Sequence, residues 1–150
     1  MNDSLKQRSA FVTGATGCIG SALVRGLAAD NWRIVALVRD RTRASFLNQL
    51  LNVELVEGDL ADAGKLISAM RDCQAVFHLA AKVHAGAGTP AKEFERDNII
   101  GARNVVAAAI ENRIERFVLF STVAVYGEGD ELFDETSLPN PTTDYGVTKL

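Results

Sequence analysis

Short runs of apolar residues alternate with longer stretches of helical periodicity along most of the chain. The apolar runs predict five β-strands. They cover residues 11–13, 33–38, 53–56, 75–79 and 116–121. Apolar positions spaced three and four residues apart predict the helices between them. These helices cover residues 18–30, 43–51, 61–71 and 90–112. A last helix is predicted to begin at Tyr145, with Asp144 as its N-cap.

The regular alternation of strands and helices predicts βαβ units and a parallel sheet. The strands are almost wholly apolar, as expected where helices cover both faces of a sheet. In the first helix, Ile19, Leu23 and Leu27 are predicted to face the core. The fold class is therefore α/β, with a doubly wound parallel sheet of at least five strands. Ligands of such sheets bind beyond the carboxyl ends of the strands.

A glycine-rich turn, TGATGCIG, joins the first strand to the first helix. At such a turn the first glycine permits a tight bend, and the second lets backbone amides approach a pyrophosphate. The third lets the helix pack closely against the sheet, and the helix N-terminus contributes its positive dipole. The spacing predicts a dinucleotide site. Its residues are Gly14, Thr16, Gly17, Cys18, Ile19 and Gly20.

The residues after the second strand select between NAD and NADP. An acid at the end of this strand binds the adenosine ribose 2′-OH of NAD, whereas a nearby Arg favours the 2′-phosphate of NADP. Here the strand ends at Val38, and Arg39, Arg41 and Arg43 follow within five positions. This pattern favours NADP, while Asp40 keeps NAD open.

A YxxxK pair, Tyr145 and Lys149, lies near the end of the sequence. Residues at i and i+4 share one face of a helix. A phenol is a poor base at neutral pH, but a neighbouring cation stabilises its phenolate, so the pair can exchange a proton with a substrate hydroxyl. Ser121 and Thr122 follow the fifth strand on the same rim as the glycine turn, and Asp59 follows the third strand, where its carboxylate could approach the adenine amino group.

These motifs together resemble the extended short-chain dehydrogenase/reductase family, in its NAD(P)-dependent epimerase/dehydratase group. The resemblance is carried by TGATGCIG (13–20), GDL (58–60), VFHLAA (76–81), NIIGARNVV (98–106), RFVLFSTVAVYGE (116–128) and YGVTKL (145–150). It covers nearly all of residues 9–150 and implies a Rossmann-like fold, truncated after the fifth strand and the start of the next helix. Residues 1–8 are expected to form a polar tail. The C-terminal strands and the substrate-binding domain of the longer family members are expected to be absent.

The resemblance implies a role for each matching residue. Tyr145 would be the general acid/base, Thr122 would hydrogen-bond the reacting oxygen, and Lys149 would hold the nicotinamide ribose. The cofactor-binding residues outside the glycine turn would be Arg39, Asp59, Leu60, Ala80, Ala81, Tyr145 and Lys149. His78 is expected to be a packed structural residue, and Asn98 is expected to support local backbone. No metal site is expected.

Substrates of this group are commonly nucleotide-activated sugars. Dehydratases of the group carry carboxylates directly after the catalytic hydroxyl residue, but here Val123, Ala124 and Val125 follow Thr122. Dehydration is therefore disfavoured. Decarboxylation is disfavoured as well, because that branch of the family usually carries a Glu in this stretch. The predicted function is that of an NAD(P)-dependent sugar-nucleotide epimerase or related oxidoreductase. An NADP-dependent carbonyl reductase, an inactive fragment and a cofactor-sensing module remain as alternatives.

The composition limits the partners and the cellular location that we expect for this chain. The chain has 16 Lys and Arg against 19 Asp and Glu, a net charge of −3, which argues against nucleic acid or an anionic membrane as its main partner. No apolar run reaches the roughly 20 residues of a membrane span, and the N-terminus has no signal-peptide pattern. Cys18 and Cys73 lack partner spacing and are expected to be packed, reduced thiols of a cytoplasmic protein. The intact enzyme is expected to be a homodimer, and His84 is left without a role.

Overall fold

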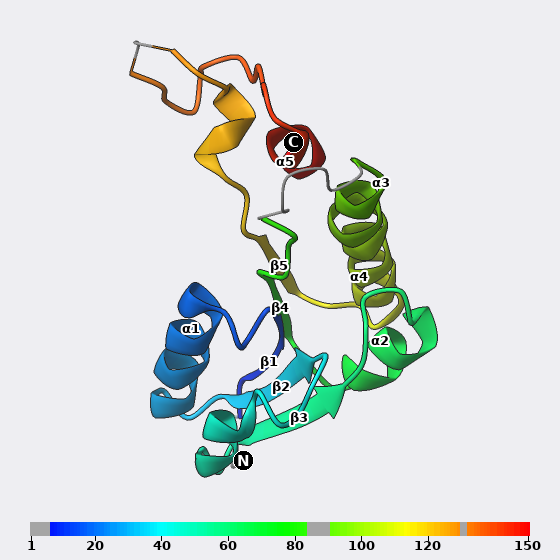
Figure 1. The fold of residues 1–150 in the computed structure, drawn as a ribbon. Coiled ribbons are helices and arrows are strands. Elements are labelled where there is room, and N and C mark those ends of the chain that lie inside the picture. Colours follow the sequence, from blue (N-terminus) through cyan, green and yellow to red (C-terminus); the bar gives the residue numbers. More distant parts are fainter. Residues whose placement is uncertain (1–6, 84–90, 130–131) are drawn as a thin grey trace.

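Five parallel strands form one sheet in the order β3-β2-β1-β4-β5 (Figure 1). The computed structural model describes residues 7–83, 91–129 and 132–150. The strands are β1 (Ser9–Thr13), β2 (Arg33–Val38), β3 (Val53–Glu57), β4 (Ala75–His78) and β5 (Arg116–Leu119). From β1 the chain first adds strands on one side and then crosses to β4 on the other. This reversal confirms the predicted doubly wound sheet and places its switch point between β1 and β4.

Helices cover both faces of the sheet. In Figure 1, α1 lies against one face, and α2 and α4 lie against the other. The helices are α1 (Cys18–Ala29), α2 (Ala63–Ala69), α3 (Ala91–Phe94), α4 (Gly101–Glu111) and α5 (Asp144–Lys149). Two 3-10 turns cover Ser45–Gln49 and Val123–Tyr126. Within the described ranges, no helix has the length and apolar character needed to cross a membrane.

The predicted helix at 90–112 contains a change of winding. A π-helical turn, Glu95–Ile100, connects α3 to α4 without interrupting the helical path. The predicted start at Pro90 lies outside the described residues. The sequence pattern gives no indication of the π turn, because its apolar spacing is compatible with an uninterrupted α-helix.

Alternate residues of strands β1 to β4 supply two separate cores. One core lies on the α1 side of the sheet and the other lies on the side of α2 and α4. The strand residues of the first are Ala10, Val12, Ile34, Ala36, Val38, Leu55 and Ala75. The strand residues of the second are Phe11, Val35, Leu37 and Val76. Since both faces are covered, the apolar runs of β1, β2 and β4 are buried as predicted.

Two local predictions are wrong. Ile19 was expected in the core, but its side chain is 63% exposed, because Gly20 and Val24 are the residues of this part of α1 that face inward. Asp144 was expected to cap the last helix, but it is the first helical residue. The hydroxyl of Thr143 is the cap, accepting the backbone N–H of Gly146 at 3.0 Å.

Strand β5 is exposed along its whole length. It forms the edge of the sheet beside β4, and Phe117, Val118 and Leu119 are 37%, 39% and 49% exposed. Its sequence predicts a strand covered on both faces, but the described residues provide no such cover. The strand also ends at Leu119, two residues earlier than predicted.

Candidate functional site

The glycine turn lies at the switch point and is packed against the end of β4. Gly14 has φ of +74°, and a Cβ at this position would lie 2.7 Å from the backbone nitrogen of Ala80. A Cβ on Gly20 would lie 2.1 Å from the carbonyl oxygen of Gly14. Two glycines are thus required by the protein's own packing. Gly17 differs, since a Cβ there would lie 3.3 Å from its nearest neighbour, the Gly14 carbonyl oxygen, and the residue is exposed.

The N-terminus of α1 is exposed and has no side-chain cap. Residues 16–19 are all exposed, no side chain caps the helix, and its first turn contains no acidic residue. By contrast, the side chain of Asp62 caps α2 and that of Thr143 caps α5. Uncapped amides at the positive end of a 12-residue helix form a favourable position for an anion.

The two cysteines have different surroundings. Cys73 is buried, and this burial raises the pKa of its thiol to about 11. Cys18 was also expected to be packed, but it is exposed because it belongs to the open first turn of α1. The packed environment predicted for Cys18 is therefore wrong.

A buried polar chain connects β1 to β4 beneath the glycine turn. The Thr13 hydroxyl shares a 2.7 Å hydrogen bond with Nδ1 of His78 and accepts the Ala80 N–H at 3.1 Å. His78 is 1% exposed. Burial and the nearby positive charge of Lys149 lower the pKa of His78 to about 4. His78 is thus the packed residue that the sequence predicted, and it helps to hold Ala80 beside Gly14.

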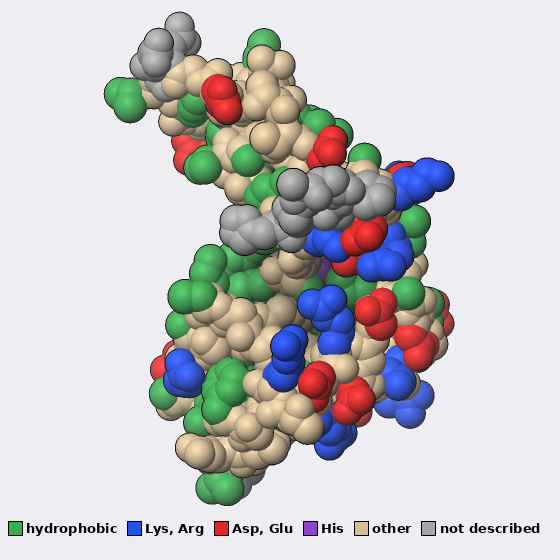
Figure 2. Space-filling view, in the orientation of Figure 1, with side chains coloured by type: hydrophobic (Ala, Val, Ile, Leu, Met, Phe, Trp, Pro, Cys, Tyr) green, Lys and Arg blue, Asp and Glu red, His purple; other side chains and the backbone are tan. Residues whose placement is uncertain are grey.

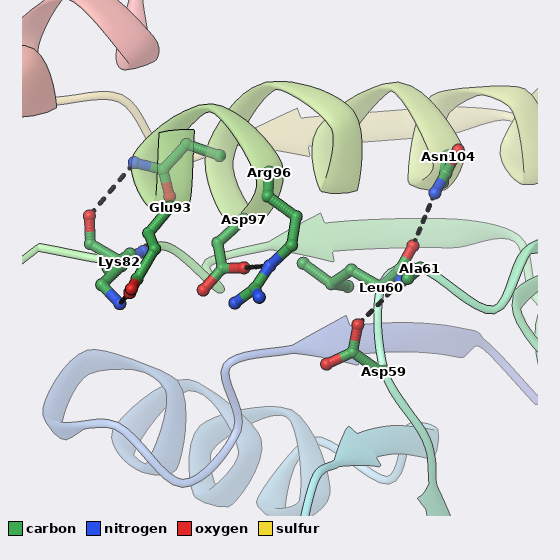
Figure 3. Close-up of polar contacts among 9 residues, drawn as sticks. Asp59, Leu60, Ala61, Lys82, Glu93, Arg96, Asp97 and Asn104 are labelled. Carbon is green, nitrogen blue, oxygen red and sulfur yellow. Dashed lines mark hydrogen bonds and ion pairs between the residues drawn. The ribbon is translucent and has the colours of Figure 1, made fainter. Parts of the chain in front are cut away.

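The loop after β3 is anchored to α4. The Leu60 carbonyl accepts a hydrogen bond from the Asn104 amide at 2.8 Å, and the Leu60 side chain lies where a Cβ on Gly101 would be 2.9 Å away (Figure 3). Oδ1 of Asp59 accepts the Ala61 N–H at 2.9 Å. These contacts fix the loop, and among the described residues they leave the second carboxylate oxygen of Asp59 without a hydrogen-bond partner.

A pocket of about 420 Å³ lies beyond the carboxyl ends of β2 and β3. Its lining residues are Arg39, Glu57, Gly58, Asp59 and Lys65. Figure 2 shows basic and acidic side chains gathered together in this part of the surface. Arg39 and Asp59 were predicted from the sequence, whereas Lys65 was missed because it lies inside a short helix and belongs to no motif.

The elements that carry Thr122, Tyr145 and Lys149 pack together. A Cβ on Gly146 would lie 2.5 Å from the Ala124 carbonyl, so this glycine lets α5 approach the 3-10 turn closely. The Thr122 hydroxyl begins that turn by accepting the Ala124 N–H at 3.2 Å. Lys149 is only 8% exposed, and burial lowers its pKa. Tyr145 is half-buried in the first turn of α5.

Asn98 connects three segments through one buried side chain. Its amide oxygen accepts the Lys82 N–H at 2.7 Å, and its amide nitrogen donates to the Lys82 carbonyl at 3.1 Å. The same nitrogen donates to the Thr148 hydroxyl at 2.9 Å. The sequence predicted support of local backbone, but the contacts are long-range. They tie the π turn to the loop after β4 and to the helix of the YxxxK pair.

The switch point, the glycine turn and the open helix N-terminus together define a dinucleotide-binding domain. A family model described as "NAD dependent epimerase/dehydratase family" matches residues 10–150. The chain belongs to this family, and the resemblance suggested by its motifs is confirmed.

Three relatives illustrate the range of the family. The chain is 39% identical over 143 residues to 4-hydroxy-2-methyl-3-oxo-4-farnesyl-3,4-dihydroquinoline-1-oxide ketoreductase of Stigmatella aurantiaca, matching 93% of this chain and 42% of that protein. It is 34% identical over 150 residues to human dTDP-D-glucose 4,6-dehydratase, matching 93% of this chain and 43% of that protein. The solved structure of MoeE5 in complex with UDP-glucose and NAD superimposes with a TM-score of 0.82 at 33% identity, covering 94% of this chain and 45% of MoeE5. The chain thus spans less than half the length of each of these proteins.

Proposed function

We propose that residues 9–150 form the cofactor-binding and proton-transferring part of an NAD(P)-dependent oxidoreductase that interconverts a secondary alcohol and a ketone. This step is common to sugar-nucleotide epimerases and to ketoreductases. The observation that carries the proposal is the close packing of α5 on the turn after Thr122, with Gly146 against Ala124 and Lys149 almost fully buried. This arrangement would serve as an active site at the rim of a dinucleotide-binding sheet.

The residues present fit NAD or NADP. Gly17 is exposed and less tightly enclosed than Gly14 and Gly20, and the uncapped first turn of α1 can accept the negative charge of a pyrophosphate. Ala80 and Ala81 would line the ribose side, and Asp59 and Leu60 would line the adenine side. When bound, the nicotinamide would take up or return the hydride.

The chain's own residues would move the proton. Tyr145 would take the proton of the substrate hydroxyl, or return it, through its phenol oxygen. Lys149 would stabilise the phenolate and hold the nicotinamide ribose. Thr122 would donate its hydroxyl proton to the reacting oxygen, since its own oxygen already accepts the Ala124 N–H. Burial of Lys149 strengthens these electrostatic effects by excluding water.

The two candidate substrate classes are a nucleotide sugar and a ketone of another kind. The complex of MoeE5 with UDP-glucose and NAD supports a nucleotide sugar. A solved UDP-glucose 4-epimerase, at a TM-score of 0.82 and 27% identity, supports an epimerase. The ketoreductase relative, at 39% identity, supports a reductase. Several relatives are dTDP-D-glucose 4,6-dehydratases, but a dehydratase is less well supported here because Val123 and Ala124 carry no group that could transfer a proton.

We also propose that the whole protein is a homodimer that uses α4 and α5. The support is the apolar surface of the helical segment that includes α4. Ile100, Val106 and Ile110 are 46%, 41% and 72% exposed. Exposed apolar groups of this kind commonly mark a protein interface. Light scattering on the whole protein would measure its mass, and a monomeric mass would reject the dimer.

The test of the proposed chemistry compares the two tyrosines of the chain. Tyr145→Phe in the whole protein should lower turnover by about 100-fold or more, because the acid/base group is lost, while cofactor affinity changes little. Tyr126→Phe is the matched control, since Tyr126 stacks on Phe133 at 5.4 Å between ring centroids and is assigned no chemistry. Full turnover by Tyr145→Phe would reject the proposal.

The substrate class is tested with the same preparations. A panel of UDP- and dTDP-hexoses is assayed for interconversion, and a panel of ketones is assayed for loss of NADPH. An epimerase leaves the amount of oxidised cofactor unchanged after many turnovers, whereas a reductase consumes one reduced cofactor for each product. Activity with neither panel would reject both substrate classes.

A further inference from the structure

We propose that Ser121 is a positioning residue that holds Lys149 in place relative to Thr122, through a hydrogen bond to the backbone of Lys149. The inference rests on the proposed function, because it concerns two residues that would act there on the substrate and the cofactor. The position of Ser121 at the rim of the sheet was expected from the sequence. Its partner, however, lies 28 positions away, and no periodicity relates the two residues.

The hydrogen bond joins the segment after β5 to α5. The hydroxyl of Ser121 donates to the backbone carbonyl of Lys149 at 3.1 Å. Ser121 directly precedes Thr122, and consecutive Cα atoms lie about 3.8 Å apart. A movement of Lys149 away from Ser121 would therefore change its position relative to Thr122 as well. Because a carbonyl oxygen has two lone pairs, it can accept from Ser121 and from a helical N–H at the same time.

The backbone around Ser121 is held on both sides. The Phe120 N–H donates to the His78 carbonyl at 3.1 Å, which continues the pairing of β5 with β4 beyond the end of the strand. On the other side, the Thr122 hydroxyl accepts the Ala124 N–H at 3.2 Å and begins the 3-10 turn. Ser121 thus presents its hydroxyl from a segment that the sheet and the turn keep in place.

No carboxylate among the described residues forms an ion pair with the ammonium group of Lys149, although this side chain is only 8% exposed. The position of the ammonium group therefore depends on where α5 lies. Asn98 donates to the neighbouring Thr148 at 2.9 Å from the π turn, and Ser121 donates to Lys149 from the end of β5. Two contacts from different elements thus restrain this part of α5.

The proposed chemistry depends on the position of the same ammonium group. Lys149 would act on the phenol of Tyr145 and on the nicotinamide ribose, and the interaction between charges weakens with distance. A misplacement of about 1 Å at an active site can cost on the order of 100-fold in rate. Ser121 is exposed, and a hydrogen bond at an exposed site has modest strength. Loss of its hydroxyl should therefore weaken the reaction without abolishing it.

The experiment removes the hydroxyl in the whole protein and measures three quantities. Ser121→Ala should lower turnover about threefold to tenfold, with the substrate identified in the hexose and ketone panels. The rising limb of the pH–rate profile, for epimerisation or for alcohol oxidation, should move about 0.5 unit to higher pH, because a displaced cation stabilises the phenolate less. Hydrogen exchange of the backbone amides of α5, measured without cofactor, should become faster.

Two further variants serve as rescue and control. Ser121→Thr keeps a hydroxyl at this exposed position and should restore the pH–rate profile and at least about half of the turnover. Ser68→Ala is the matched control, since Ser68 is also exposed and its hydroxyl also donates to a lysine carbonyl, that of Lys65 at 2.9 Å in α2. This control should leave all three quantities unchanged.

The outcomes separate the inference from the proposed function. An unchanged pH–rate profile in Ser121→Ala, with turnover lost in Tyr145→Phe, would overturn the inference and leave the proposed function standing. Equal losses in Ser121→Ala and Ser121→Thr would also overturn it, because the hydroxyl would then not be the group that matters. Absence of turnover by the wild type with every substrate would reject the proposed function, and the inference with it.

Discussion

The strands β1, β2 and β4 and the edge strand β5 belong to one sheet but have opposite environments. Val76 in β4 is fully buried, whereas Val118 in β5 is 39% exposed. We call β1 to β4 with α1, α2 and α4 the closed half, and β5 with the turn Val123–Tyr126 and α5 the open end. The closed half carries the predicted cofactor residues except Tyr145 and Lys149. The open end carries the predicted catalytic residues.

The difference in exposure between β4 and β5 shows that strands with a similar apolar pattern can be buried to different extents. Each of β4 and β5 contains three consecutive apolar residues, but β4 has strands on both sides and helices over both faces. Strand β5 has one neighbouring strand and little cover among the described residues. Hydrophobic pattern alone therefore identifies the strand, while the amount of stabilisation depends on what packs against it.

The largest expected effect comes from placing a methyl group at equivalent tight contacts in the two regions. Gly20→Ala puts a Cβ 2.1 Å from a backbone oxygen in the closed half and should lower the free energy of unfolding by about 3 kcal/mol. Gly146→Ala makes a similar clash, at 2.5 Å, in the open end. It should cost less than about 1 kcal/mol, because six-residue α5 can shift away, but it should lower turnover.

Urea unfolding of both variants measures the difference. Gly26→Ala is the control, since a Cβ at this position in α1 has nothing within 4 Å. It should raise stability by about 0.5–1 kcal/mol. Equal destabilisation by Gly20→Ala and Gly146→Ala would show that the open end is as firmly packed as the closed half.

The second effect is a loss of folding stability at low pH. His78 has a pKa near 4 in the folded protein against 6.5 for the free side chain, so the unfolded state binds its proton first as pH falls. Stability should therefore be complete above pH 6.5 and decrease toward pH 4, by on the order of 3 kcal/mol. Unfolding of the wild type and of His78→Gln at several pH values measures this loss. The difference between the profiles isolates His78 from the carboxylates that titrate in the same range, and parallel profiles would contradict the assignment.

The smallest expected effect is the change in the free energy of unfolding when a valine of β4 or of β5 is replaced by threonine. Val76→Thr puts a hydroxyl into a fully buried position and should cost about 2 kcal/mol. Val118→Thr makes the same change in β5 and should cost less than about 0.5 kcal/mol. Thermal or urea unfolding of both variants gives the comparison. A large cost for Val118→Thr would mean that another part of the protein covers β5.

The sequence predicted the strands and their order of succession because apolar runs and glycine turns are local signals. The three glycines of the turn, Asp59 and the YxxxK pair were found in the same way. Lys65 and Thr13 were not found, because their contacts join segments that only the folded sheet brings together. Asn98 was noticed, but its bonds to Lys82 and Thr148 span 16 and 50 positions and follow no periodicity.

The π turn before α4 sets the rotation of the whole of α4 about its own axis. One residue corresponds to about 100° of rotation in an α-helix. Deleting one residue from the segment 95–100 would therefore turn α4 by about this angle and carry Val105 away from the sheet. The exposed Val106 and Ile110 show that α4 also has apolar residues outside its buried face. Hydrophobicity alone does not select its orientation, and the extra residue of the π turn determines which side meets the core.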